Sequence, residues 1–499
     1  MPGGGPRRRS ALAPCRLCVR HYRGPVIPDR LRPVLDEVRP LAERFDGAGH
    51  RIYLVGGIVR DLLLGRDLGD GGDLDLTTDA RPEETKAVLE GWADAVWNQG
   101  ERFGTVGARK GERAFEITTH RAEAYQPDSR KPDVRFATEV EADLARRDFT
   151  VNAMALALPE PALIDPHGGA ADLAAGRLRT PLAPEESFSD DPLRMMRAAR
   201  FIAGFGLAPD DDLVRAVHEM HPRLEIVSSE RIRDELDKLL VVDAPGRGLW
   251  FLVDTGLADE FLPELPALRV EQDPIHRHKD VLAHTIAVVE KTSPNKIVRL
   301  AALLHDIGKP KTRSIGPAGV SFHHHEVVGA RMARERLQAL RYPKEEVEAV
   351  SRLVFLHLRF HTYRMGWTDS AVRRYVRDAG DLLEELNELT RCDCTTRNKR
   401  KAEELARRMD DLQARIAELR EREELAAIRP DLDGRQVMDH LDVGPGPVVG
   451  KALAFLLELR LEEGPLGEEE AYRRLDRWWA EQSDQAETSL KTPPLSDST

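Results

Sequence analysis

Two aspartates separated by one residue are the first feature of this sequence that can do chemistry. Asp73 and Asp75 alternate with Leu74 and Leu76. A strand has a side-chain period of two, so both carboxylates would face one side and both leucines the core. Adjacent carboxylates repel each other, and a cation that prefers oxygen ligands, such as Mg²⁺, removes that repulsion. The pattern therefore predicts a Mg²⁺ site at Asp73 and Asp75.

A pair of glycines precedes these carboxylates. Arg51–Val55 is expected to form a short buried strand, which Gly56 and Gly57 end before a short helix over Ile58–Leu64. Because glycine has no Cβ, a phosphate group can approach the backbone closely there. Together the two features predict binding of a metal-bound nucleoside triphosphate. The alternative is a solvated hairpin that carries surface aspartates.

The stretch Leu54–Thr78 resembles the nucleotidyltransferase signature of the polymerase-beta superfamily, in its class II branch of tRNA CCA-adding enzymes and bacterial poly(A) polymerases. Further matches extend from about residue 50 to residue 480. The resemblance implies template-independent addition of CCA to tRNA 3′ ends from CTP and ATP. Within this stretch it implies that Asp73 and Asp75 are the catalytic Mg²⁺ ligands and that Gly56, Gly57 and Arg60 bind nucleotide.

Two segments that follow are expected to lie beside the same site. Ala114–Thr119 alternates like a strand, which makes Glu116 a candidate third Mg²⁺ ligand or, alternatively, a surface glutamate. His120–Thr138 is polar and basic and predicts a mobile loop, although solvated surface loops have a similar composition.

The run Arg146–Ala153 matches the family's Arg-Arg-Asp-Phe-Thr-x-Asn motif residue for residue. Guanidinium groups such as that of Arg147 can clamp triphosphate oxygens with two hydrogen bonds each. On a helix Asp148 and Asn152 would share a face, at i and i+4, and hold a ribose hydroxyl. A salt-bridged surface is the alternative. The next segment, Asp165–Leu173, resembles the family's hinge motif.

Asp191 and Arg194 supply a candidate pair for reading the nucleotide base. On a helix they would point the same way, one accepting and one donating hydrogen bonds. Cytosine and adenine both present an amine donor beside a ring acceptor, whereas guanine and uracil would leave groups unpaired at about 1–3 kcal/mol. The family motif is Glu-Asp-x-x-Arg, here with Asp190 for Glu, and it adds Arg197 to the nucleotide-binding residues. Pro192 leaves open that Asp191 only caps the helix.

Ser228–Leu240 reads as a capped amphipathic helix and resembles the last motif of the family's neck. We interpret it as part of the architecture and not of the chemistry.

Histidines and aspartates recur between Gln272 and Asn398. Such residues, when they meet in a helical core, can bind one or two divalent metals. The set resembles the HD phosphohydrolase domain. That resemblance implies a metal site formed by His284, His305, Asp306 and Asp393, with His325 or His357 beside them.

The length of 499 residues predicts about three domains. The fold class expected is α+β, with a small mixed-sheet nucleotidyltransferase head followed by all-helical neck, HD and tail domains. The predicted segments are a disordered extension (1–28), the head (29–180), a neck with base recognition (181–267), the HD domain (268–400), a helical body and tail that contacts tRNA (401–482) and a disordered tail (483–499).

Composition restricts the partners and the compartment. No apolar run approaches the ~20 residues of a membrane span. The four cysteines, Cys15, Cys18, Cys392 and Cys394, favour a reducing cytoplasm over a disulfide framework. A net charge of −12 disfavours nonspecific nucleic-acid binding, so RNA must meet a local basic surface. The densest one, around Arg391–Arg408, is equally well explained as a solvated helix face. The expected partners are tRNA, CTP and ATP, with no membrane and no DNA.

Three other functions fit parts of the pattern. A poly(A) polymerase shares the head motifs, but the acidic pI of about 5.8 favours CCA addition. A partial enzyme that adds only C or only A fits the motifs as well. A metal-dependent phosphohydrolase with a vestigial head is disfavoured because Asp73, Asp75, Arg147 and Asp148 are all present.

Overall fold

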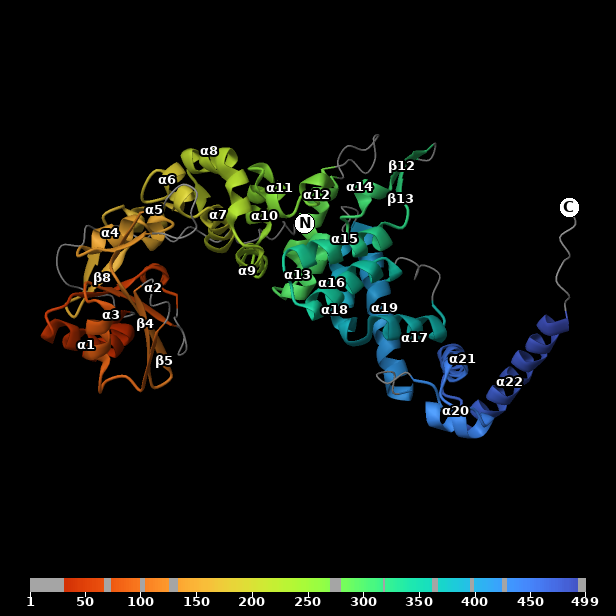
Figure 1. Ribbon diagram of the computed structural model, residues 1–499. Coiled ribbons are helices and arrows are strands. Elements are labelled where there is room, and N and C mark those ends of the chain that lie inside the picture. The colour runs from red at the N-terminus through yellow and green to blue at the C-terminus, as the bar shows by residue number, and fades with distance from the viewer. Residues whose placement is uncertain are drawn as a thin grey trace, which may run out of the picture. The chain divides into compact units, whose positions relative to one another are not determined.

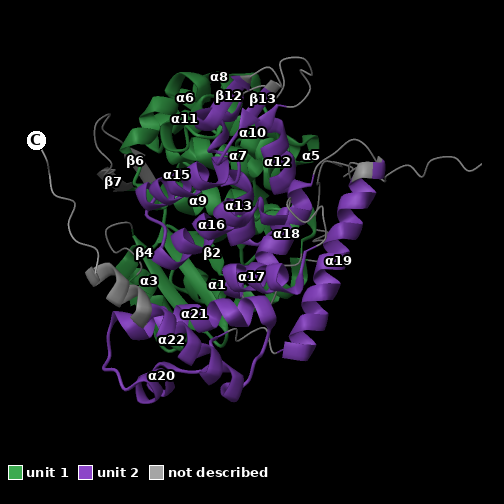
Figure 2. Ribbon diagram, turned by 90° about the vertical axis from the view of Figure 1, so that its right-hand side faces the viewer, with its two compact units in different colours: residues 1–266 green, residues 267–499 purple. Residues whose placement is uncertain are grey.

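The computed structural model describes residues 31–66, 73–98, 104–124, 133–269, 280–316, 319–360, 367–394, 399–423 and 429–491. The expected N-terminal extension, with Cys15 and Cys18, lies outside these residues. The chain divides into two compact units, residues 1–266 and residues 267–499 (Figure 2). This division falls one residue before the expected end of the neck.

The first unit is built on a seven-stranded mixed sheet in the order β3-β4-β5-β2-β1-β8-β9. Strands β2 and β5 pair in parallel, and the other neighbouring strands pair antiparallel. The sequence prediction of a small mixed sheet is confirmed. The strands are β1 (Ile52–Val55), β2 (Leu74–Thr78), β3 (Ala95–Asn98), β4 (Thr105–Lys110), β5 (Arg113–Thr119), β8 (Ala155–Leu158) and β9 (Ala162–Ile164).

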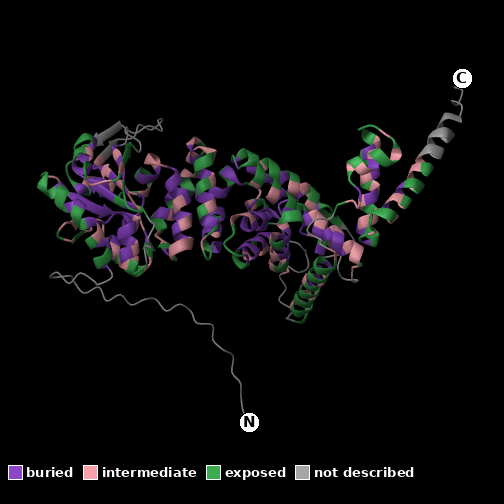
Figure 3. Ribbon diagram, turned by 90° about the horizontal axis from the view of Figure 1, so that it is seen from below, coloured by how far each residue is buried: buried purple, intermediate pink, exposed green. Residues whose placement is uncertain are grey.

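Helices cover the two faces of this sheet differently. Buried residues of the first three helices pack on one face around Leu54, Leu76 and Phe115, and the central strands β1 and β2 are accordingly mostly buried (Figure 3). The fourth helix packs through Val140 and Leu144 on residues of β1 and β8 that point to the other face. The helices are α1 (Arg32–Gly47), α2 (Gly57–Leu64), α3 (Pro82–Leu89) and α4 (Val140–Ala145) (Figure 1).

A separate antiparallel hairpin, β6 (Arg121–Ala124) with β7 (Asp133–Phe136), occupies part of the segment for which a mobile basic loop is expected. The prediction of a loop is therefore wrong at both ends of the segment, where the backbone pairs. Residues 125–132, between the two strands, lie outside the described residues.

Helices and one short parallel strand pair complete the first unit. Helix α7 packs against both α9 and α10, and Asp191 and Pro192 lie in the short link that precedes α7. The elements are α5 (Gly169–Ala175), β10 (Arg177–Leu178), α6 (Pro184–Asp190), α7 (Leu193–Phe205), β11 (Ala208–Pro209), α8 (Asp211–Met220), α9 (Ser229–Leu240), α10 (Gly246–Asp254) and α11 (Leu257–Phe261).

The second unit is helical apart from one hairpin. Its central helix α13 is buried along its whole length from Val298, and the Asn295 side chain caps its start by accepting from Ile297 N and Val298 N. The elements are α12 (Val281–Lys291), α13 (Lys296–Leu304), α14 (Lys309–Thr312), β12 (Arg313–Gly316), β13 (Gly319–Phe322), α15 (His325–Ala339), α16 (Lys344–Leu356), α17 (Asp369–Ala379), α18 (Leu383–Asp393), α19 (Lys399–Glu423), α20 (Gly434–Leu441), α21 (Pro447–Glu463) and α22 (Glu468–Lys491).

Helix α22 continues to Lys491, past residue 482, where the tail is expected to begin. Among the helices that the structure describes, none is both long enough and apolar enough to cross a membrane.

Candidate active sites

Three carboxylates share one face of the head sheet. Asp75 on β2 is paired directly with Glu116 on β5, so their side chains point to the same side. Asp73 immediately precedes β2, and the alternation along the chain gives it the side of Asp75. Leu74 and Leu76 are buried on the opposite side while Asp75 stays exposed. The structure therefore brings together the three residues that the sequence predicts as metal ligands.

The electrostatics of this carboxylate face favour a cation. The pKa of Asp75 is raised because the surrounding chain removes part of the water around its carboxylate, which stays open to solvent on one side, and because Glu116 and Asp73 add negative charge, while Arg147 partly opposes this. A bound divalent cation would neutralise the repulsion and replace the missing water. Oxygen donors of this kind fit Mg²⁺.

Gly56 joins the carboxylates to a cationic pocket. Its φ of 74° lies in the left-handed region, which glycine adopts without strain. A Cβ at this position would lie 2.7 Å from Arg147 Nη1 and 4.0 Å from Asp75 Oδ2. The space beside the Gly56 backbone is therefore reached by both a guanidinium and a metal-ligand candidate, and Gly57 begins helix α2 immediately afterwards. This arrangement suits a phosphate chain that bridges a metal and an arginine.

Asp143 fixes the position of Arg147, and no sequence motif identified it. Its fully buried carboxylate accepts from Arg146 Nη2 at 2.9 Å and from Arg147 Nη2 at 3.1 Å. Burial alone would raise the pKa of Asp143, but the two arginines outweigh burial and hold the pKa well below its usual range. The ionised carboxylate therefore holds both guanidiniums beside the pocket.

The sequence predicts that Asp148 and Asn152 lie on a common α-helix, and this prediction is wrong. Helix α4 ends at Ala145, and the chain extends at Phe149 before a single 3-10 turn over Thr150–Asn152. The Phe149 side chain is fully buried at this extended residue. The turn still brings the two residues together, because Asn152 Nδ2 donates to Asp148 Oδ1 at 3.0 Å.

Asp148 is also the end of an ionic network that reaches the neck helices. Arg197 Nε donates to Asp148 Oδ2 at 2.8 Å, and Arg200 Nε on the same helix donates to Glu235 Oε2 at 2.8 Å. Burial favours the neutral acid, yet Arg197 and the Asn152 hydrogen bond lower the pKa of Asp148 to about 2. Glu235 belongs to α9, which the sequence interpretation assigned to architecture alone.

Arg60 points into the protein. Its guanidinium donates to Asn152 Oδ1 at 2.7 Å and to both oxygens of Asp61, and it lies 4.1 Å from the centroid of the Phe205 ring. The side chain is only 8% exposed. In this arrangement Arg60 positions Asn152, whereas the sequence predicts that it contacts the triphosphate.

Asp191 and Arg194 do not form a pair in this structure. Asp191 precedes α7 in an extended conformation, and its Oδ1 accepts from Leu193 N at 3.1 Å, a bond that is compatible with the alternative interpretation of Asp191 as a helix cap. Its Oδ2 accepts from Arg231 Nη2 at 2.8 Å. Arg194 is buried and donates to the Ser187 hydroxyl at 2.8 Å and to the Arg146 carbonyl. The prediction that both residues point the same way from one helix is wrong, because Pro192 starts the helix after Asp191.

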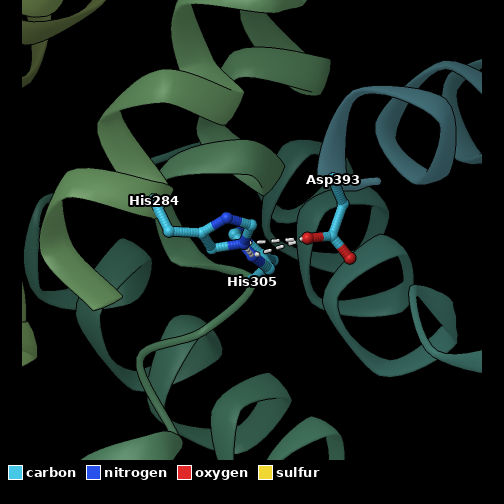
Figure 4. A group of neighbouring side chains, drawn as sticks. All are labelled: His284, His305 and Asp393. Atoms are coloured by element: carbon cyan, nitrogen blue, oxygen red, sulfur yellow. Dashed lines mark hydrogen bonds and ion pairs between the residues drawn. The ribbon is translucent and has the colours of Figure 1, made fainter. Parts of the chain in front are cut away.

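Six histidines and aspartates of the second unit form two adjoining triads. His284, His305 and Asp393 make the first, and the ligand atoms within each triad lie within 4.8 Å of one another. His284 Nε2 lies 2.9 Å from Asp393 Oδ1 and 3.4 Å from His305 Nε2 (Figure 4). The second triad is Asp306, His325 and His357.

Three of these imidazoles are oriented in the same way. The Nδ1 atoms of His305, His325 and His357 each lie within 2.6–2.9 Å of a backbone carbonyl three residues earlier. A carbonyl can only accept, so each Nδ1 donates and each Nε2 is directed to the other side of the ring. The Nε2 atoms of His325 and His357 are buried and have no hydrogen-bond partner. Such orientation by the backbone is typical of metal-binding histidines.

The protonation states of the triad residues also favour binding of cations. Burial lowers the pKa of His357 to about 3, so this imidazole is neutral. Burial opposes the charge of His305 too, but Asp306 and Asp393 raise its pKa to about 10. Lys309 Nζ donates to Asp306 Oδ2 at 2.6 Å. The set of imidazole nitrogens and carboxylate oxygens fits Zn²⁺, Mn²⁺ or Fe²⁺, and it includes all four residues that the sequence predicts.

Two arginines of the basic cluster near α19 form ion pairs within the second unit, and a third packs on an aromatic ring. Arg391 donates to Asp410 at 2.7 Å, Arg407 lies 3.8 Å from Glu403, and the Arg408 guanidinium lies 5.2 Å from the centroid of the Phe360 ring. These contacts favour the interpretation as an ordinary helix face for the arginines that take part in them.

Family models match three parts of the chain. A poly(A) polymerase head domain matches residues 52–179, a probable RNA- and SrmB-binding site of polymerase A matches residues 206–268, and an HD domain matches residues 281–419. The first two matches lie almost entirely in the first compact unit and the third lies in the second.

Among curated proteins, the A-adding tRNA nucleotidyltransferase of Deinococcus radiodurans is 34% identical over 69% of this chain and 80% of its own length. The CCA-adding enzymes of Geobacillus stearothermophilus and Streptococcus gordonii are 38% and 40% identical over 47% of this chain. These two matches span 56% and 57% of the relatives' length.

Solved structures share the fold. The CCA-adding enzyme of Bacillus stearothermophilus, in complex with CTP, superposes with a TM-score of 0.64 at 24% identity and covers 92% of this chain and 100% of its own. The Thermotoga maritima enzyme, complexed with tRNA, has a TM-score of 0.56 at 19% identity and covers 91% of this chain and 96% of its own. The 34% identity with the tRNA nucleotidyltransferase of Deinococcus radiodurans over 80% of its length, together with the head-domain and HD-domain matches, shows that the chain belongs to the family of tRNA nucleotidyltransferases that join a poly(A) polymerase head domain to an HD domain.

Proposed function

We propose that this chain adds CCA to tRNA 3′ ends from CTP and ATP without a nucleic-acid template, in the cytoplasm, where these substrates are available. The observation that carries the proposal is the placement of Gly56 between Arg147 and Asp75, which joins a phosphate pocket to a metal site. Asp73, Asp75 and Glu116 would hold Mg²⁺, which activates the RNA 3′-hydroxyl and stabilises the departing pyrophosphate when bound.

Different residues of the head bind the triphosphate and the ribose of the nucleotide. Arg147, held by Asp143, neutralises the triphosphate while the Gly56 backbone approaches it. Asn152, held by Arg60 and Asp148, lies beside the pocket and orients the ribose. The RNA 3′-oxygen bonds to the α-phosphorus, the bond from that phosphorus to pyrophosphate breaks, and the hydroxyl proton is released.

Base reading by Asp191 and Arg194 requires an exchange of hydrogen bonds. Arg194 would break its hydrogen bonds to Ser187 and to the Arg146 carbonyl and donate to the acceptor nitrogen of the base. Asp191 would release Arg231 and accept from the amine of the base. The free-energy cost of this exchange is small when every broken hydrogen bond is replaced, as with cytosine or adenine. With guanine or uracil some groups stay unpaired, and binding loses the free energy of their desolvation.

Addition of A alone is the second candidate. The observation that favours it is the match to the A-adding relative, which extends over 69% of this chain, whereas the CCA-adding relatives match over 46–48%. The head residues are compatible with both activities, because an Asp–Arg pair accepts C and A alike.

One assay separates the candidates. Purified protein is given Mg²⁺, labelled CTP or ATP singly and together, and tRNA transcripts that end in the discriminator base, in C or in CC. Extension of all three transcripts to CCA followed by arrest supports the proposal. Extension only of the CC transcript, with ATP, assigns A addition, and long A tracts on arbitrary RNA assign a poly(A) polymerase.

We also propose that the two triads of the HD domain bind two divalent cations and hydrolyse phosphoesters. The support is the pair of buried Nε2 atoms of His325 and His357 in the second triad, neither of which has a hydrogen-bond partner although His325 Nε2 lies 3.5 Å from Asp306 Oδ1, next to a complete first triad. Lys309, paired with Asp306, would lie beside a phosphate bound there.

The metal content tests this proposal. In an Asp73→Ala, Asp75→Ala background, which removes the head site, dialysis against Mn²⁺ should leave about two ions per chain. His357→Ala should lower this to about one, and His323→Ala, at an exposed neighbour outside both triads, should not change it. If His357→Ala still binds about two ions per chain, the second metal site is contradicted. Opening of 2′,3′-cyclic nucleotides to monophosphates, and release of phosphate from 2′-phosphorylated nucleotides, should require both triads.

A further inference from the structure

An exposed tryptophan lies in line with the metal ligands of the head. Strand pairing sets Asp75 opposite Glu116, Glu116 opposite Gly107, and Gly107 opposite Trp97. Directly paired residues point to the same face of a sheet, so this row runs across β2, β5, β4 and β3 on the face that carries the carboxylates. With strands about 4.8 Å apart, Trp97 starts roughly 10 Å from Glu116.

The indole of Trp97 lies flat over its glycine partner. A Cβ at Gly107 would lie 2.3 Å from Trp97 Cε2 and Nε1, so the indole occupies the space that a side chain at this position of β4 would fill. The side chain is nevertheless 39% exposed. A glycine opposite a tryptophan leaves room for the ring to fold inward along the row. The result is an accessible aromatic surface about one strand spacing, ~5 Å, from the strand that bears Glu116.

The position of the triphosphate pocket tells which substrate meets this ring. Arg147 and Gly56 lie beside Asp75 on the β1 side of the row, while Trp97 lies beyond Glu116 on the other side. In phosphoryl transfer the attacking and leaving oxygens are roughly in line across the phosphorus. If pyrophosphate leaves toward Arg147, the attacking 3′-hydroxyl must come from the side of Glu116 and Trp97.

We propose that Trp97 binds the RNA acceptor by stacking against a base at its 3′ end, so that the terminal hydroxyl is held at the carboxylates. This inference rests on the proposed nucleotidyl transfer to RNA and extends it to the binding of the acceptor. Stacking suits an enzyme whose acceptor end changes with each addition, because every base has a face that can stack and no base edge needs to be read.

The test uses an acceptor-stem RNA whose 3′-terminal base is 2-aminopurine, the fluorescence of which is quenched by stacking. Wild-type protein should quench it. Trp97→Leu, which keeps apolar bulk over Gly107, should lose the quenching and weaken RNA binding by roughly 5- to 150-fold. Trp97→Phe should retain most of both. Val96→Ala is the matched control, since Val96 is 41% exposed on the same strand and points to the opposite face.

A second variant moves the ring without removing it. In Gly107→Ala the new Cβ would displace the indole, so quenching should fall while Trp97 is still present. In steady-state assays Trp97→Leu should raise the KM for RNA and leave the KM for CTP and ATP unchanged.

The two proposals fail in different ways. Quenching that is equal in wild type and Trp97→Leu overturns the role of Trp97, even if nucleotide addition is intact. Quenching that depends on Trp97 in a protein that adds no nucleotide to any RNA supports the acceptor-binding role and overturns the proposed reaction.

Discussion

Asp75→Asn is expected to reduce nucleotide addition to tRNA by about a thousandfold or more, because the cation loses the charge of its central ligand while the side-chain shape is kept. The measurement is single-turnover incorporation of labelled CTP or ATP at saturating Mg²⁺. Activity within tenfold of wild type would contradict the assignment of Asp75 as a metal ligand.

The same substitution should not destabilise the metal-free head. The pKa of Asp75 is raised, which means that the folded protein disfavours its charge, so an uncharged amide relieves repulsion from Glu116 and Asp73. Asp75→Asn should therefore melt at or above the wild-type temperature without Mg²⁺.

Asp79 is the matched control. It follows the same strand, but it accepts from Arg51 N and Arg51 Nε, both at 2.9 Å. Burial opposes its charge, yet these bonds to Arg51 keep the pKa of Asp79 below its usual value. Asp79→Asn should lower the melting temperature and retain addition activity, the reverse of Asp75→Asn.

The carboxylate face was predictable because its cause is local. A period of two along β2 forces Asp73 and Asp75 to one side once Leu74 and Leu76 enter the core, and the same alternation in β5 brings Glu116 beside them. The glycine turn before α2 was predictable for a similar reason, since a positive φ at Gly56 requires glycine.

The arginines were less predictable, because a sequence does not tell which guanidinium is left for a substrate. Arg60 and Arg194 look equivalent to Arg147 as motif residues, yet each is buried against partners from other elements. Those partners, Asn152 and Ser187, are brought there by the tertiary fold. The supporting residues Asp143 and Arg231 were missed for the same reason.

The helical prediction for Asp148 and Asn152 failed because it used only their spacing of four residues. The chain is extended at Phe149, where that spacing alone suggests a continuous helix. In the second unit, by contrast, the four predicted ligands were recovered, and what the sequence left open was whether His325 and His357 belong with them. That depends on three histidines each donating to the carbonyl three residues earlier in the chain, which no spacing rule encodes.

Gly169→Ala is expected to have the largest effect of any single methyl group added to the head. A Cβ there would lie 2.0 Å from Thr150 O and 2.8 Å from Thr150 C, and backbone atoms cannot move aside as a side chain can. Gly169 is fixed from the other side, because Asp165 accepts from Gly169 N at 2.7 Å and from Ala170 N at 3.0 Å. The strain should destabilise the head by about 3 kcal/mol, the upper end for overpacking.

Because Gly169→Ala would displace Thr150, the substitution tests nucleotide binding as well as stability. Thr150 begins the turn that ends at Asn152, so a shift of Thr150 moves the amide that Arg60 and Asp148 hold. We expect a lower melting temperature together with a raised KM for CTP and ATP. Gly47→Ala is the control, because no atom lies within 4 Å of its Cβ position at the end of α1, and it should change neither quantity. If Gly169→Ala instead melts with wild type, α5 must be free to move away from the turn, and the segment Asp165–Leu173 would act as the hinge that its motif resembles rather than as a fixed support for Asn152.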